Sequence, residues 1–390
     1  MAIQTKLSMG WLAVVVIVLG SILRASDGSS IQVPGPTGPY AVGTFWVMLS
    51  DPGRSNPFLD DGSRREVLVR FWYPAPRLGS CTPAPYMLPK VSRYFSEKLG
   101  ISAPELRTNS CYQAPVLTGR HPVVLASHGY TGMLTDYTFL FEDLASHGYV
   151  VASIAHTYES TAVEFPDGKL ITSAFGTHLL EGSLRMDEKR LKLARSLREG
   201  DINLVSAQLR RWSESGGALS GRLDLEKIGA LGHSLGADTV MVGLKDPEVK
   251  AAVLLDPVAL SAASTASSSK PVLLVSDGRP EWSVPECVLW NNLHGEKRAI
   301  LFPGADHFAS SDAVWLATSI AGIHSETGVV GPERMIAATR TAVAAFFDWQ
   351  LSESPPGRLL NGLSTEYSDL VVTTKEQALC RLTTVHRAAQ

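Results

Sequence analysis

The segment Gly232-His233-Ser234-Leu235-Gly236 matches the pattern Gly-x-Ser-x-Gly. It follows the apolar run Lys227–Leu231 and precedes a stretch beginning at Leu235 that favours a helix. A serine on such a sharp strand-to-helix turn is exposed for attack, and side chains at the flanking positions would collide with neighbouring backbone, so both are glycine. This context predicts that Ser234 is the nucleophile of an acyl-transfer reaction rather than part of a glycine-rich turn without function.

A serine hydroxyl is a weak nucleophile at its ordinary pKa, so the hypothesis requires a histidine that accepts its proton. His307 lies in a loop directly after the predicted strand Arg298–Phe302, where an α/β fold of this kind places its functional loops. We therefore expect His307 to act as the general base. The other histidines that follow Ser234 lack this context: His294, His324 and His386.

Two carboxylates could orient this histidine. Asp256 ends the predicted strand Ala251–Leu255, and Asp277 ends the predicted strand at Pro271–Val275, so either side chain could emerge at the same rim. The acid would fix the tautomer of His307 and stabilise the imidazolium as it forms. The periodicity of apolar residues does not choose between them. Two further carboxylates are less suitable, because one adjoins His307 in the chain and the other lies one helical turn beyond the serine: Asp306 and Asp238.

The negative charge that develops on the substrate carbonyl needs backbone N–H donors, an oxyanion hole. One donor comes from the residue after the nucleophile and the other from the loop after an earlier strand. Leu235 is expected to supply the first N–H. Tyr130, in the segment Ala126–Gly132, is expected to supply the second, because Gly129 would let the chain turn so that the Tyr130 amide faces the carbonyl. His128 is more suitable as a hydrogen-bonding residue that shapes this loop than as an acid or base.

The remaining chain alternates short apolar runs with helical patterns. Near-continuous apolar runs fit strands buried on both faces, and their alternation with helices predicts an α/β fold with a mostly parallel sheet covered by helices. The longest helical stretch runs from about Leu184 to Trp212, and its charged residues are expected to face solvent; a final helix is expected over Met335–Leu351. The predicted strands are Tyr40–Leu49, Glu66–Tyr73, Pro122–Ser127, Tyr149–Ile154, Lys227–Leu231, Ala251–Leu255, Pro271–Val275 and Arg298–Phe302.

Composition argues against several classes of partner. Lys and Arg number 35 against 38 Asp and Glu in 390 residues, so the net charge of -3 offers no basic footprint for nucleic acid. The sequence has no His-Glu-x-x-His motif, no clustered set of Cys and His, and no glycine-rich phosphate loop. We therefore expect no nucleic-acid partner, no metal and no cofactor. Nothing in the sequence indicates an oligomeric state.

The N-terminal segment is expected to target the protein for export. An apolar, uncharged run from Leu7 to Leu23 follows Lys6, so residues 1–25 are predicted to be a signal peptide. The run also reaches the minimum length of a membrane span, which keeps an uncleaved N-terminal anchor as the alternative. Both interpretations place the rest of the chain in an oxidising space outside the cytoplasm.

The chain contains four cysteines, an even number that allows two disulfide bonds. Four cysteines permit three sets of pairings, which spacing alone does not resolve. A bond between Cys81 and Cys111 would close a short, polar, proline-rich segment.

Three segments carry a recognisable combination of motifs: His128-Gly129-Tyr130, Asp143–Ala152 and Gly232–Gly236. Together they resemble the plasma-type platelet-activating factor acetylhydrolases. The resemblance covers about residues 40–350 and extends to Phe71-Trp72-Tyr73-Pro74, Glu281-Trp282 and His307-Phe308.

This resemblance implies an α/β-hydrolase fold, with a catalytic domain over residues 40–351 and a C-terminal extension over residues 352–390. In that family the acid follows the strand immediately after the nucleophile helix, which favours Asp256 over Asp277. The resemblance also implies a calcium-independent 1-alkyl-2-acetylglycerophosphocholine esterase. Such an enzyme removes short or oxidised acyl groups from the middle position of phospholipids, and the substrate would bring it to lipid surfaces.

Other functions stay open at this stage. The same machinery serves carboxylesterases, lactonases and thioesterases that act on small metabolites or polyesters, and an inactive binding protein could keep the fold. The sequence departs from the family at Tyr130, where the family often has Leu-Gly, and over Leu260–Ser269, which is rich in Ser and Ala. Both departures would reshape the acyl pocket. The segment Glu159–Gly182 is expected to cap the site and set acyl specificity.

Overall fold

The computed structural model describes residues 30–100, 104–176, 188–260, 263, 265–278, 282–320 and 327–373. The predicted signal peptide or anchor at residues 1–25 lies outside these residues, as do His324, Cys380 and His386. No helix in the described ranges is long and apolar enough to cross a membrane.

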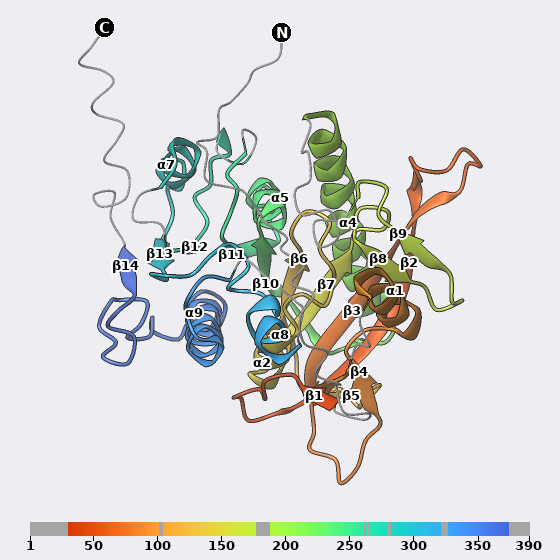
Figure 1. Cartoon of the computed structure of the whole chain (residues 1–390), viewed down its shortest axis with the longest axis horizontal. Helices are drawn as coiled ribbons and strands as arrows, with labels where there is room; N and C mark the ends of the chain where they lie inside the picture. The colour runs from red at the N-terminus through yellow and green to blue at the C-terminus, as the bar shows by residue number, and fades with distance from the viewer. Residues whose placement is uncertain are drawn as a thin grey trace, which may run out of the picture.

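Twelve strands of the described chain form one sheet, and a separate hairpin pairs two more (Figure 1). The strands are β1 (Ser30–Gln32), β2 (Ala41–Ser55), β3 (Arg64–Ala75), β4 (Pro83–Pro85), β5 (Glu105–Tyr112), β6 (His121–Ser127), β7 (Val150–Ala155), β8 (Ala162–Glu164), β9 (Leu170–Thr172), β10 (Leu223–His233), β11 (Val249–Leu255), β12 (Val272–Ser276), β13 (Lys297–Leu301) and β14 (Val371–Thr373). The helices are α1 (Pro89–Leu99), α2 (Thr138–Ser146), α4 (Glu188–Ser215), α5 (Leu235–Gly243), α7 (Val284–Asn291), α8 (Ala313–Ser319) and α9 (Pro332–Ser352).

The sheet has the order β1-β5-β2-β3-β7-β6-β10-β11-β12-β13-β14, with β4 paired to β5. Strands β7, β6, β10, β11, β12 and β13 run parallel to one another, whereas β3 is antiparallel to both β2 and β7. The carboxyl ends of the six parallel strands therefore meet at one edge of the sheet. The predicted α/β class with a mostly parallel central sheet is confirmed.

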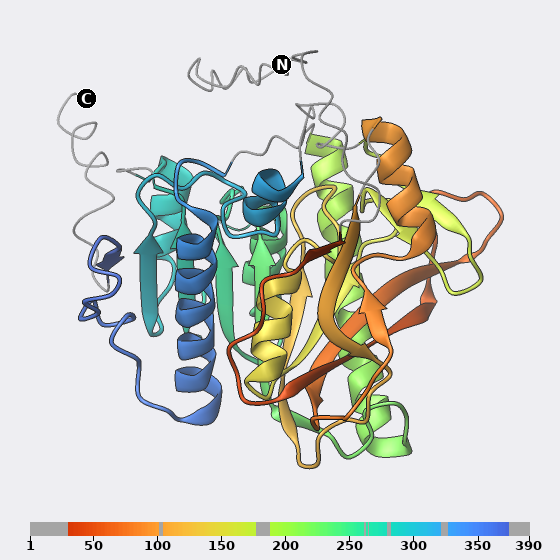
Figure 2. The same cartoon turned by 60° about the horizontal axis from the view of Figure 1, so that its bottom comes forward.

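The strands are apolar throughout because both faces of the sheet are covered. Along β6, Val123 and Leu125 join the core beneath α4, α5 and α7, whereas Val124 and Ala126 join the core beneath α2, α8 and α9. Figure 2 shows α2 and α9 side by side across one face, with α4 on the opposite side. Continuous burial on two faces explains why these strands read as unbroken apolar runs.

All eight predicted strands are present, with ends that differ by a few residues. Six strands of the described chain were not predicted: the three-residue strands β1, β4, β8, β9 and β14, and the longer strand β5. β5 carries Arg, Thr, Asn and Ser, so it has no apolar alternation, and it lies between β1 and β2 near one end of the sheet. β14 lies in the C-terminal extension and pairs with β13.

A disulfide bond joins Cys81 to Cys111, one of the pairings that the sequence left open. It lies beside the β4 and β5 pair, where Pro83 is the register partner of Cys111. Cys287 in α7 is also disulfide-bonded. The described cysteines are therefore oxidised.

Candidate active site

Ser234 occupies the single-residue turn between β10 and α5. Its backbone has φ 55° and ψ -122°, a strained conformation for a residue with a side chain. A Cβ added to Gly232 would lie 2.3 Å from the Gly236 carbonyl oxygen, and one added to Gly236 would lie 2.1 Å from the Ser127 carbonyl oxygen. Only glycine therefore fits at either flank. The backbone N–H of Ser234 donates to the Leu255 carbonyl at 3.0 Å, which joins the turn to the neighbouring strand.

Three side chains meet at the carboxyl edge of the sheet. His307 Nε2 lies 3.0 Å from Ser234 Oγ, and His307 Nδ1 lies 2.5 Å from Asp256 Oδ2. An ionised carboxylate only accepts hydrogen bonds, so the proton of the neutral imidazole lies on Nδ1. Nε2 is then free to accept the serine hydroxyl proton. We call this chain of two hydrogen bonds the Ser-His-Asp relay.

Asp256 is the carboxylate that contacts His307, and Asp277 helps to hold it. Asp256 follows β11 directly and has a positive φ of 39°, which turns its side chain toward the histidine loop. Its second oxygen, Oδ1, accepts the backbone N–H of Asp277 at 3.0 Å. Asp238 has another partner set: its carboxylate accepts the backbone N–H groups of Ala259 and Leu260 at 3.0 and 2.9 Å.

His233 supports the loop that carries His307, a role that sequence reasoning missed. The two imidazole rings lie 4.6 Å apart, and His233 Nε2 donates to the His307 carbonyl oxygen at 2.8 Å. Burial, together with the nearby His307, lowers the pKa of His233 to about 3. His233 is therefore neutral at physiological pH and keeps this hydrogen bond. The sequence signal for this supporting role was that His233 lies directly before Ser234 in the Gly-x-Ser-x-Gly motif.

The loop Ser127–Gly132, which we call the β6 loop, lies against the serine. A Cβ on Gly129 would lie 3.1 Å from His233 Nδ1 and 3.5 Å from Ser234 Cβ, so the backbone passes close to the turn that carries Ser234. Tyr130, the residue after Gly129, and Leu235, the residue after Ser234, thus lie on two chain segments that converge on the serine.

His128 makes the hydrogen bonds of a residue that shapes the β6 loop. Its Nδ1 lies 2.7 Å from the Gly129 carbonyl oxygen and its Nε2 lies 2.7 Å from Ser160 Oγ. Burial and the charge of Arg198 hold the pKa of His128 well below its usual range. The imidazole is therefore neutral, and Nδ1 donates its proton to the carbonyl.

An aromatic cluster extends from Tyr130. The Tyr130 and Phe175 ring centroids lie 5.9 Å apart, Phe175 and Phe58 lie 5.7 Å apart, and Phe58 stacks on Tyr158 at 5.1 Å. These residues come from the β2–β3 connection, the β6 loop and the segment around the β8–β9 hairpin. The described part of the predicted cap, residues 159–176, thus contributes an aromatic ring beside the β6 loop.

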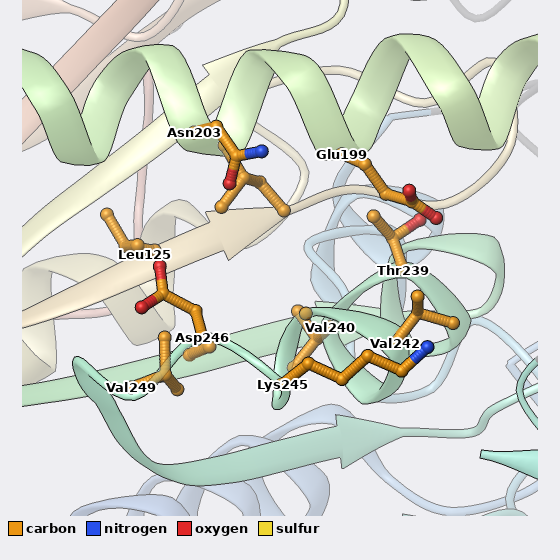
Figure 3. Close-up of a pocket in the computed structure, with 12 residues that line it drawn as sticks. Leu125, Glu199, Asn203, Thr239, Val240, Val242, Lys245, Asp246 and Val249 are labelled. Atoms are coloured by element: carbon orange, nitrogen blue, oxygen red, sulfur yellow. The ribbon is translucent and has the colours of Figure 1, made fainter.

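Away from this relay, the described chain has a cavity but no metal-binding cluster. No group of three or more His, Cys, Asp or Glu side chains in the described ranges could hold a metal ion. A cavity of about 390 Å³ lies between α4 and α5, with Glu199 and Asn203 facing Thr239 and Lys245 (Figure 3). The Ser-His-Asp relay does not line this cavity.

The sheet order, the strained turn at Ser234 and the relay at the carboxyl edge define an α/β-hydrolase. Residues 25–211 match the family model described as platelet-activating factor acetylhydrolase, isoform II. The platelet-activating factor acetylhydrolase of Cavia porcellus is 25% identical over 279 residues, which cover 62% of this chain and 58% of that protein. The protein of that name from Gallus gallus is 20% identical over 374 residues, covering 82% of this chain and 84% of that protein. The chain is therefore similar in sequence to the platelet-activating factor acetylhydrolases and has the α/β-hydrolase fold.

The chain spans only 57 to 58% of the mammalian relatives that it matches. A solved structure with a similar fold is a ferulic acid esterase from Streptomyces cinnamoneus, with a TM-score of 0.74 and 29% sequence identity. That alignment covers 88% of this chain and 99% of the esterase.

Proposed function

We propose that the protein is a carboxylic ester hydrolase in which Ser234 is the nucleophile, His307 the general base and Asp256 the acid that orients it. The observation that carries this proposal is the relay from Ser234 Oγ through both ring nitrogens of His307 to Asp256. A histidine already hydrogen-bonded to the serine, in the tautomer that accepts its proton, is what nucleophilic catalysis by serine requires.

The mechanism uses two acyl transfers. Ser234 Oγ attacks the ester carbonyl as its proton passes to His307 Nε2, and the backbone N–H groups of Tyr130 and Leu235 stabilise the oxyanion. His307 then protonates the departing alcohol, which leaves the acyl group on Ser234. Water, deprotonated by the same histidine, releases the acid and restores the enzyme.

For the substrate, we propose short or oxidised acyl esters of glycerophospholipids, and in particular 1-alkyl-2-acetylglycerophosphocholine. The match of residues 25–211 to the family model described as platelet-activating factor acetylhydrolase, isoform II, and the similarity to proteins of that name support this proposal. Lipid surfaces would then be the place of action, and residues 40–351 would form the catalytic domain.

A second candidate substrate class is the aromatic acyl ester. It is favoured by the aromatic cluster beside Tyr130 and by the similarity to a ferulic acid esterase over 99% of that enzyme's chain. Aromatic rings stack favourably on one another at these centroid separations. A substrate with a planar aromatic acyl group would be recognised by stacking of that group on this cluster, rather than through a phospholipid headgroup.

We also propose that the protein is exported. The Cys81–Cys111 bond supports this, because structural disulfides persist mainly in oxidising compartments.

The test compares hydrolysis of four esters: 1-alkyl-2-acetylglycerophosphocholine, a long-chain diacyl phospholipid, a soluble acetate ester and methyl ferulate. Ser234→Ala is the control, and labelling by a fluorophosphonate reports the nucleophile directly. We expect Ser234-dependent cleavage of the acetyl phospholipid in preference to the diacyl lipid. Preference for methyl ferulate would move the substrate to aromatic esters, and hydrolysis that survives in Ser234→Ala would refute the proposed mechanism.

A further inference from the structure

A fully buried ion pair lies beneath the β6 loop. Arg198, in the middle of α4, and Glu159, just after β7, are both 0% exposed, and Arg198 Nη2 lies 2.7 Å from Glu159 Oε2. We expected the charges of this helix to face solvent, and for Arg198 that expectation is wrong. The reason is that its partners come from remote segments of the chain, which sequence spacing does not bring together.

The pair holds the β6 loop on both sides of Tyr130. Arg198 donates to the carbonyl oxygens of His128 at 2.5 Å and of Gly129 at 2.8 Å. Glu159 Oε1 accepts the backbone N–H of Thr131 at 2.8 Å. Bonds between a charged group and a backbone group are shorter and stronger than neutral ones. The residues before and after Tyr130 are therefore fixed by a single buried unit, which we call the Arg198–Glu159 clamp.

Peptide geometry links this clamp to the Tyr130 amide. The Gly129 carbonyl and the Tyr130 N–H belong to one planar, trans peptide unit, so they point in opposite directions. Because the carbonyl is bound to Arg198, the N–H points away from the guanidinium. The cation also polarises the peptide unit, which makes its N–H a stronger donor.

Backbone strain at Thr131 indicates that the clamp imposes a conformation. Thr131 has φ 52°, which is costly for a β-branched residue. The Glu159 bond to its N–H and the Thr161 hydroxyl bond to its carbonyl keep it there. Without these two hydrogen bonds, Thr131 would adopt a less strained backbone conformation, and the chain before it would change its orientation.

A second buried chain of hydrogen bonds fixes Arg198 itself. Asp201, one helical turn beyond Arg198, lies 3.1 Å from His156 Nδ1, and His156 Nε2 lies 2.9 Å from Ser127 Oγ. Ser127 Oγ in turn accepts from Arg198 at 3.1 Å. Arg65 neutralises Asp201 at 2.7 Å. These groups are buried, so they anchor the loop rather than meet a substrate.

We propose that Arg198 and Glu159 are positioning residues that aim the Tyr130 amide at the developing oxyanion. This inference rests on the proposed function, because it assigns a purpose to the oxyanion donor named there. Stability does not explain the pair, since a buried ion pair is often no more stabilising than apolar residues of similar volume.

The test measures ester hydrolysis by Arg198→Met, Arg198→Lys and the double variant Arg198→Met/Glu159→Met. Arg340→Met is the matched control, because Arg340 is also buried, donates to the carbonyls of Pro34, Gly35 and Phe139, and lies 3.5 Å from the Asp143 carboxylate. Removing one oxyanion donor typically lowers kcat by a factor of about 10²–10³, so a misaimed donor should lower it about 10- to 100-fold.

We expect this loss in Arg198→Met, with KM changed less than about threefold, because the donor acts in the transition state. The affinity for a trifluoromethyl ketone, which forms a tetrahedral oxyanion on the serine, should weaken in parallel with kcat/KM. Arg198→Lys should recover only part of the rate, because an ammonium cannot bind two carbonyls in the geometry of a guanidinium. Arg340→Met should keep the wild-type kcat per folded molecule.

The double variant replaces both charges and so avoids an unpaired buried carboxylate if Arg198→Met is too unstable to assay. Unchanged kcat in folded Arg198→Met or in the double variant, beside an inactive Ser234→Ala, would overturn the clamp and leave the proposed function intact. A rise in KM alone would also overturn it. Wild-type protein without Ser234-dependent hydrolysis would instead refute the proposed function itself.

Discussion

Replacing Asp256 by asparagine tests which carboxylate orients His307. The structure determines how the new amide would lie. Asp256 Oδ1 accepts the backbone N–H of Asp277, so an asparagine in its place would keep its side-chain oxygen there and present its NH₂ group to His307 Nδ1. Nδ1 would then have to accept a hydrogen bond, which moves the ring proton to Nε2, opposite Ser234. A protonated Nε2 cannot take the serine proton.

The expected loss follows from this change of tautomer. In the Ser-His-Asp template, a wrong tautomer with intact geometry lowers kcat by about 10⁴-fold, which is about 5 kcal/mol of transition-state stabilisation. The backbone should not be disturbed, because asparagine tolerates a positive φ such as the 39° of Asp256. Asp277→Asn keeps its backbone N–H and is the matched control, with kcat expected within a few-fold of wild type.

The assay is kcat on a soluble acetate ester, together with the rate of fluorophosphonate labelling of Ser234. Both rates should fall in Asp256→Asn, since both depend on a deprotonated serine. An Asp256→Asn enzyme that keeps a tenth of its activity, or equal losses in the two variants, would show that Asp256 does not set the tautomer of His307.

Three further predictions concern packing, covalent structure and charge. Gly236→Ala would place a Cβ 2.1 Å from the Ser127 carbonyl oxygen. We therefore expect the free energy of unfolding to fall by about 1–3 kcal/mol and the activity to fall at least about tenfold. Wild-type denaturation and kinetics would contradict the steric argument. Cys111→Ser removes a disulfide bond with a sequence separation of 30, which should lower the free energy of unfolding by about 3 kcal/mol in urea titrations. Wild-type stability would show that the bond constrains the unfolded chain little. Burial, with a contribution from nearby Asp312, raises the pKa of Asp136 to about 7, against about 3.9 in an unfolded chain. The native state thus binds more protons than the unfolded state between these values, and stability should fall as the pH rises from about 4 through 7. Asp136→Asn should flatten part of that slope in thermal melts at pH 5 to 8, and an unchanged slope would assign it to other groups.

Local sequence patterns predicted the central strands of the sheet and the positions of Ser234 and His307. The eight apolar runs became strands because a sheet covered on both faces needs apolar residues at every position. The position of Ser234 was predicted from the two glycines around it, which the structure shows to be the only residues that fit. His307 was predicted from its place after a strand, since the parallel strands end at one edge.

Tertiary structure decided what these rules left open. Asp256 and Asp277 both end strands at the same edge, and only the turn at Asp256 determines that its carboxylate meets His307 while Asp277 contributes its N–H. The polar strand β5 has no apolar periodicity to predict it. Arg198 resembles the solvent-facing charges beside it in α4, yet its carboxylate and carbonyl partners lie 39 and 69 or 70 residues away in the chain. Periodicity reports which face of an element is buried, but a buried charge is specified by partners that only the folded chain brings together.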